Sequence, residues 1–199
     1  MNAAEKIVEA YFREVKGLFT QTSIQGVQQS ELDIVAVDPR QTPPLFYHIE
    51  SSVSISSGFS RITCDPFDSQ KCKERANMAS QRRTVGFFIA RKFFSEAVLK
   101  TLEKMGCKED RVKRILVSWG FNEDAKKELK LKGVECLSLK TIFQELADHL
   151  AKETKNLDSD ILRTIQLFVR SEPDMPRIYG IKATRRQRLA KGKAGNVNG

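Results

Sequence analysis

Two short apolar runs joined by a proline-rich turn constrain this sequence more than any other feature. Residues 31–52 read ELDIVAVDPRQTPPLFYHIESS, in which LDIVAVD and LFYHIESS are typical of strands and QTPP of a turn. Each run carries an acid, Asp33 in the first and Glu50 in the second. If the short turn makes the two strands antiparallel neighbours, the two carboxylates approach each other across the pair.

Two close, buried carboxylates repel each other, so at neutral pH they require a proton or a cation between them. Mg²⁺ suits such a pair, since it takes oxygen ligands and often binds through only one or two carboxylates plus water and substrate phosphate. It can also polarise a phosphodiester and generate hydroxide from bound water. The alternative for each acid is a solvated residue at a strand edge or a turn cap.

The rest of the pattern predicts an α/β domain with a mixed sheet. Early strands joined by short turns are expected to be antiparallel, and later strands joined through helices to be parallel. Predicted helices cover residues 2–16, 70–83, 93–106, 122–133, 140–155 and 159–171. Predicted strands cover residues 18–24, 32–38, 45–53, 85–90, 111–120 and 134–139. Residues 54–69 are loop-like. We expect one domain over residues 1–170 and a basic tail over 171–199, disordered beyond about Lys182.

Charge is concentrated at the C-terminal end. The net charge is +9, but the segment from Met175 onward holds seven basic residues and no acid, which leaves the preceding body at about +2. A basic tail favours polyanions through counterion release, although a solubilising end has the same composition. The segment 70–83 is also basic. The residues predicted to bind nucleic acid are Lys71, Lys73, Arg75, Arg82, Arg83, Arg185, Arg186 and Arg188.

Composition excludes several other classes of protein. Four cysteines show no C-x-x-C spacing, and His48 and His149 are the only histidines, which argues against zinc and redox sites. No apolar run approaches the roughly 20 residues that cross a bilayer. The N-terminal residues lack the pattern of a signal peptide, so we expect a cytoplasmic protein without membrane contact.

The acids lie in a pattern that resembles the PD-(D/E)XK nuclease superfamily, the restriction endonuclease-like fold. The resemblance covers roughly residues 3–150 and implies a core of order α-β-β-β-α-β. It implies that Asp33 in ELDIVAVD and Glu50 in FYHIESS bind the metal, and that Glu5 in EKIVEAYF supplies a further acid from the first helix. Glu9 is a weaker match for that helix acid.

The sequence departs from the family pattern at Ser52, which stands where the family has its motif lysine. Three explanations remain open. The lysine has moved, with Arg61, Lys71, Lys73 and Arg75 as the nearest candidates. Alternatively, the metal activates water without it, with His48, Glu50 and Ser52 on one face of the strand. In the third, catalysis has been lost, because removing a proton-transfer group costs about 10²- to 10⁴-fold.

The resulting expectation is a nuclease that hydrolyses phosphodiester bonds in DNA with Mg²⁺ or Mn²⁺. Its expected catalytic residues are Asp33, Glu50, Ser52 and Glu5. Because many members of this family pair to cut both strands, a homodimer is left open. The alternatives are a weakened or inactive module of the same fold that binds nucleic acid, or a protein-interaction domain. A structure discriminates between them, since a Lys or Arg pointing between two close carboxylates favours activity.

Overall fold

The computed structural model describes residues 2–53, 61–154, 157 and 159–171. The chain divides into two compact units, the first ending at Lys140 and the second beginning at Thr141. The single domain expected over residues 1–170 stays a prediction. The basic tail with Arg185, Arg186 and Arg188 lies outside the described residues.

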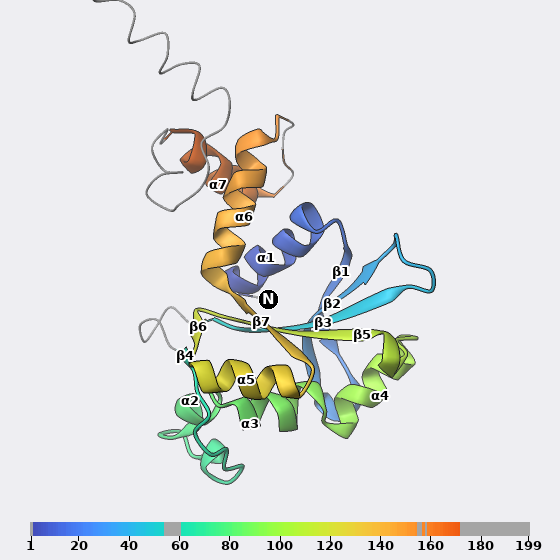
Figure 1. Cartoon of the computed structure of the whole chain (residues 1–199), viewed down its shortest axis with the longest axis vertical. Helices are drawn as coiled ribbons and strands as arrows, with labels where there is room; N and C mark the ends of the chain where they lie inside the picture. Colours follow the sequence, from blue (N-terminus) through green and yellow to red (C-terminus); the bar gives the residue numbers. More distant parts are fainter. Residues whose placement is uncertain (1, 54–60, 155–156, 158, 172–199) are drawn as a thin grey trace, which may run out of the picture. The chain divides into compact units, whose positions relative to one another are not determined.

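The first unit is built on a five-stranded mixed sheet (Figure 1). In spatial order its strands are β1 (Phe19–Gln25), β2 (Glu31–Asp38), β3 (Leu45–Ser52), β5 (Val112–Ser118) and β7 (Val134–Ser138). The strands β1, β2 and β3 are antiparallel neighbours, whereas β5 runs parallel to β3 and β7 runs parallel to β5. The α/β class and these strand directions confirm the prediction. A separate pair of short strands joins β4 (Arg61–Ile62) to β6 (Gly120–Phe121).

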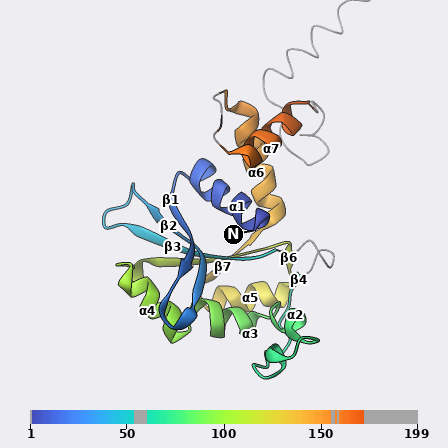
Figure 2. The ribbon, with the colours of Figure 1, turned by 180° about the vertical axis from the view of Figure 1, so that it is seen from behind.

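Helices cover both faces of this sheet, as opposite views of the unit agree (Figures 1 and 2). One face carries α1 (Ala3–Ala10), which continues as the π-helical turn η1 (Tyr11–Val15). The other face carries α4 (Glu96–Lys104) and α5 (Glu123–Leu131). These two helices end as predicted at Gly106 and Gly133, whose φ angles of 80° and 72° are easy only for glycine. Shorter helical turns are η2 (Val27–Gln29), η3 (Lys71–Lys73), α2 (Met78–Gln81) and η5 (Glu109–Arg111).

Residues 85–90 are helical, so the strand predicted there is wrong. The Oγ1 of Thr84 accepts a hydrogen bond from the backbone N–H of Phe87 at 3.2 Å and caps α3 (Val85–Phe87). The chain then continues as the π-helical turn η4 (Phe88–Phe93). Phe88 and Phe93 are buried in the core on the face of the sheet that α5 covers. A short apolar run such as VGFFIA fits a buried helix as well as a strand, and here the threonine cap favours the helix.

The single basic helix predicted over 70–83 is also wrong. Only η3 and α2 are helical there, and Glu74 between them has extended backbone angles (φ −82°, ψ 123°). Lys71, Lys73, Arg75 and Arg82 are exposed on this irregular segment, and Arg83 is half-buried.

The second unit contains a helix pair, and both helices were predicted. In this pair α6 (Leu139–Lys152) packs on α7 (Asp160–Ser171) through Ala147 and Val169. The Gln166 amide donates to the backbone carbonyl of Glu153 at 3.0 Å, which satisfies a polar group at the end of α6. Across the described residues, no helix has both the length and the apolar character needed to cross a membrane.

Candidate functional site

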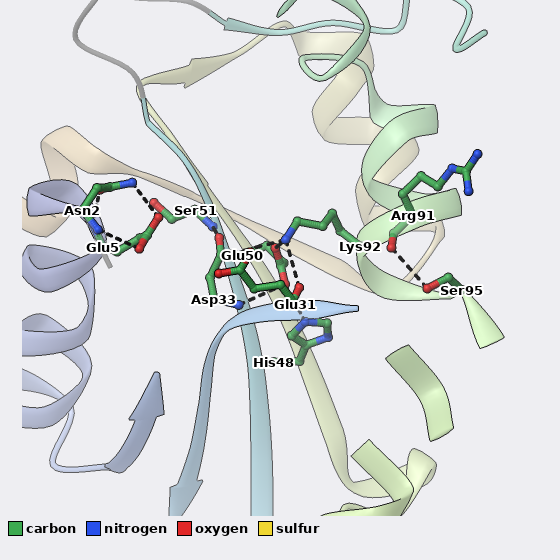
Figure 3. Close-up of polar contacts among 10 residues, drawn as sticks. All are labelled: Asn2, Glu5, Glu31, Asp33, His48, Glu50, Ser51, Arg91, Lys92 and Ser95. Atoms are coloured by element: carbon green, nitrogen blue, oxygen red, sulfur yellow. Dashed lines mark hydrogen bonds and ion pairs between the residues drawn. The ribbon is translucent and has the colours of Figure 1, made fainter. Parts of the chain in front are cut away.

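Two acids from adjacent strands point to the same face of the sheet (Figure 3). Strands β2 and β3 pair with Ile34 opposite Ile49, so Asp33 and Glu50 are the next residues along each strand and share a face. The backbone N–H of Ser51 donates to Asp33 Oδ2 at 2.8 Å, and the N–H of Asp33 donates to Glu50 Oε1 at 3.4 Å. The side chain of Glu50 is fully buried, and that of Asp33 is 13% exposed. The sequence correctly predicted that these acids meet.

A lysine from the helical segment η4 lies between the two acids. The Nζ of Lys92 is 2.6 Å from Glu50 Oε2 and 3.3 Å from Asp33 Oδ1. It also donates to the backbone carbonyl of Glu31 at 3.1 Å. The neighbouring Arg91 points away from the acids (Figure 3). The π-helical turn thus aims one of two consecutive basic side chains at the carboxylates, and such turns often occur at functional sites.

The charges of this cluster are not balanced. Burial and the nearby charge of Glu50 raise the pKa of Asp33 to about 6, although Lys92 acts in the opposite direction. Burial raises the pKa of Glu50 to about 7, against the lowering effect of Lys92. Burial acts to lower the pKa of Lys92, but the two carboxylates outweigh it and the net pKa is raised. Both acids therefore still favour a proton or a further cation when the ammonium is in place.

His48 lies behind Glu50, away from solvent. Its Nε2 is 2.9 Å from Glu50 Oε1, and both side chains are fully buried. Burial, with the positive charges of Arg114 and Lys92, lowers the pKa of His48 to about 3. The imidazole is therefore neutral at pH 7, and its contact with Glu50 is a hydrogen bond rather than an ion pair.

A divalent ion at this cluster would have few protein ligands. Among the described residues, no group of three or more His, Cys, Asp or Glu side chains is arranged to hold a metal. The two carboxylates are not fully neutralised by Lys92. Such a pair suits Mg²⁺ or Mn²⁺, because these ions complete their coordination shells with water and phosphate oxygens. Asp33 and Glu50 are the residues that would hold such an ion.

Glu5 is the acid expected from the first helix. Its contacts give it a structural role in capping that helix, with no catalytic role needed to account for its presence. Its carboxylate accepts from the backbone N–H of Asn2 at 2.9 Å, and its own N–H donates to Asn2 Oδ1 at 3.0 Å. This is a capping box at the start of α1. Glu9, the weaker candidate, bonds to Arg13 and Thr20.

Ser52 lies two residues beyond Glu50 on the same strand and is half-buried. It pairs in register with Ser118 of β5. The cation of the cluster comes from Lys92 and not from Arg61, Lys71, Lys73 or Arg75, the four candidates nearest to Ser52 in sequence.

Sequence reasoning missed Lys92 because it assigned VGFFIA to a strand. The signal that could have found it is Thr84, a good N-cap directly before the apolar run. A helix that begins at Thr84 continues through Phe88. Lys92 lies four residues after Phe88, about one helical turn further along. A scan against protein-family models matched none, and searches of curated proteins and of solved structures also found no similar protein.

Proposed function

We propose that this protein is a metal-dependent nuclease that hydrolyses phosphodiester bonds in DNA. The observation that carries the proposal is the contact of Lys92 Nζ with both Asp33 and Glu50. Two acids and a lysine are the residue types that the PD-(D/E)XK motif requires. In this chain the lysine comes from a helix instead of position 52, which supports the first of the three explanations for Ser52.

The order of elements supports the same proposal. A helix, α1, precedes three antiparallel strands, and helical segments then lead to β5, which pairs parallel to β3. The resemblance implies this order for a restriction endonuclease-like core, with the acids on its second and third strands. Asp33 and Glu50 occupy those two strands.

The chemistry divides between the acids and the lysine. Asp33 and Glu50 would hold Mg²⁺ or Mn²⁺, and a bound ion supplies a polarised phosphodiester and a water of lowered pKa. Lys92 holds a fixed positive charge beside the acids, in a largely buried setting where it can stabilise negative charge developing on a phosphate. Its raised pKa keeps it protonated at neutral pH, so it orients and neutralises rather than accepting a proton.

Exposed basic residues of the 71–83 segment supply contacts to the DNA backbone. Lys71, Lys73, Arg75 and Arg82 are exposed on it. Such contacts position a nucleic acid without reading its sequence, so affinity is expected to fall steeply with salt. We assign Arg83 and the tail arginines Arg185, Arg186 and Arg188 to the same role.

One observation favours a second candidate, an inactive module that binds nucleic acid or a protein partner. Lys92 makes three contacts, to both carboxylates and to a backbone carbonyl, and so partly neutralises the acids without any metal. A cluster held in this way can persist after catalysis is lost.

Nicking of supercoiled plasmid in Mg²⁺ separates the two candidates. We expect wild type to nick the plasmid, EDTA to abolish the reaction, and Lys92→Met to slow it by about 10²- to 10³-fold, the usual cost of one electrostatic group. Lys100→Met is the matched control, because Lys100 is exposed on α4 and pairs there with Glu96. It should retain the wild-type rate. No nicking by wild type in Mg²⁺ or Mn²⁺ would favour the inactive module, and full activity of Lys92→Met would contradict the assigned site.

A further inference from the structure

The carboxylate of Glu50 has two oxygens with different surroundings. Oε1 faces inward, 2.9 Å from His48 Nε2 and 3.4 Å from the backbone N–H of Asp33. Oε2 lies 2.6 Å from Lys92 Nζ. One oxygen is therefore held by the fold, which leaves the other for the charged cluster.

The contacts of His48 define which nitrogen carries its proton. Nδ1 is buried and has no hydrogen-bond partner among the described residues. A protonated Nδ1 would be a buried donor without an acceptor, which costs more than an unused lone pair. Glu50 Oε1 accepts hydrogen bonds, so the proton belongs on Nε2.

The imidazole ring also contacts the segment that carries the lysine. Its ring packs edge-on against Phe93, with the two ring centroids 5.1 Å apart. Phe93 is fully buried and directly follows Lys92 in η4. His48 thus contacts Glu50 through a hydrogen bond (Figure 3) and the lysine-bearing segment η4 through its ring packing on Phe93.

We propose that His48 is a positioning residue for Glu50. As a neutral Nε2–H imidazole it holds Oε1 and turns Oε2 toward the position of the cation, be it Lys92 Nζ or a divalent ion. The metal part of this inference rests on the proposed nuclease function, whereas the hydrogen bond itself does not. Partners that orient a metal-binding carboxylate in this way are typically worth about 10- to 100-fold in metal affinity or activity.

The test uses two substitutions in the full chain. His48→Gln keeps a donor N–H close to the place of Nε2, whereas His48→Leu keeps the bulk and removes the donor. We expect His48→Leu to weaken Mn²⁺ binding in calorimetry, and to lower the kcat of nicking, each by about 10- to 100-fold. The KM for DNA should be unchanged, and His48→Gln should restore most of both losses. Thermal unfolding of each variant shows that it is folded.

Nitrogen-15 NMR of the metal-free protein reads the tautomer independently. The chain has only two histidines, so His149→Gln leaves His48 as the sole imidazole signal. We expect a proton on Nε2 and none on Nδ1.

A proton on Nδ1, equal losses in both variants, or no loss in either would overturn the inference. Wild type that neither binds Mn²⁺ nor nicks DNA overturns the proposed function instead, and the NMR result then still decides the hydrogen bond. If His48→Leu does not fold, His48→Gln and the NMR spectrum carry the test.

Discussion

Strand β2 carries an aspartate near each end, and their surroundings shift the two pKa values in opposite directions. Asp38 bonds to Arg40, two residues along the chain, through Oδ1 at 2.8 Å to the guanidinium and 3.0 Å to the backbone N–H. These hydrogen bonds lower the pKa of Asp38. Asp33 meets Lys92, 59 residues away, at 3.3 Å, and its pKa is nevertheless raised to about 6.

The difference separates a structural acid from a candidate functional one. Asp38 is stabilised as an anion by a local partner and needs nothing more. Asp33 and Glu50 share one ammonium in a buried place, so folding makes both harder to ionise. Acids whose pKa values are raised by burial and by each other's charge are characteristic of sites that bind a cation or perform acid–base chemistry.

The largest expected effect on nicking comes from substituting Asp33, with the same substitution at Asp38 for comparison. Asp33→Asn should reduce plasmid nicking by about 10³-fold or more, because losing a carboxylate ligand forfeits several kcal/mol of charge stabilisation. Asp38→Asn is the matched control on the same strand and should nick at the wild-type rate. If both variants keep full activity, the site is wrongly assigned. If Asp38→Asn loses as much activity as Asp33→Asn, the loss reflects folding of β2.

The pH dependence of stability should have opposite signs for the two kinds of acid. The pKa of Glu50 is raised from 4.5 to about 7, so the metal-free folded protein binds more protons than the unfolded chain between these values. Its stability contribution is present at pH 4 and is lost as the pH rises to about 7. Asp38 behaves in reverse, because its lowered pKa gives a contribution present above pH 3.8 and lost in stronger acid.

Urea unfolding at a series of pH values measures this contrast. Relative to wild type, Glu50→Gln should gain roughly 2 to 3 kcal/mol between pH 4.5 and pH 7, at about 1.4 kcal/mol per unit of pKa. Asp38→Asn should be less stable than wild type at neutral pH, and this difference should shrink only as the pH falls below about 3.8. His48 titrates in wild type and in both variants, so its contribution largely cancels in the difference. A Glu50→Gln curve parallel to that of wild type would show that burial does not raise the pKa of Glu50.

The smallest expected effect concerns Glu5. Because Gln can also take the third position of a capping box, Glu5→Gln should leave nicking unchanged and alter the unfolding free energy by less than about 0.5 kcal/mol. Asn2→Ala, which removes the cap itself, should cost about 1 kcal/mol. A tenfold or larger loss of nicking in a folded Glu5→Gln variant would instead make Glu5 the helix acid that the resemblance implies.

The comparison also shows what the sequence can predict. The hairpin of β2 and β3 follows from strand-like runs and a short turn, all within 22 residues, and it places Asp33 beside Glu50 without further information. The α/β class follows similarly from the alternation of helices and strands. Each of these inferences depends on residues that are close in sequence.

Lys92 could not be placed in that way, for two physical reasons. Its distance along the chain from Asp33 means that only the packing of η4 on the sheet brings them together. The run before it is also too short for hydrophobic periodicity to separate a strand from a helix. The same limit applies to residues 70–83, where the extended backbone of Glu74 interrupts a segment of helical composition.

The central claim is that Asp33 and Glu50 form a divalent-cation site beside Lys92, and calorimetric titration with Mn²⁺ tests it most directly. We expect saturable binding by wild type and by Asp38→Asn, and none by Asp33→Asn. Wild type that binds no Mn²⁺, or Asp33→Asn that binds it as well as wild type, would contradict the account.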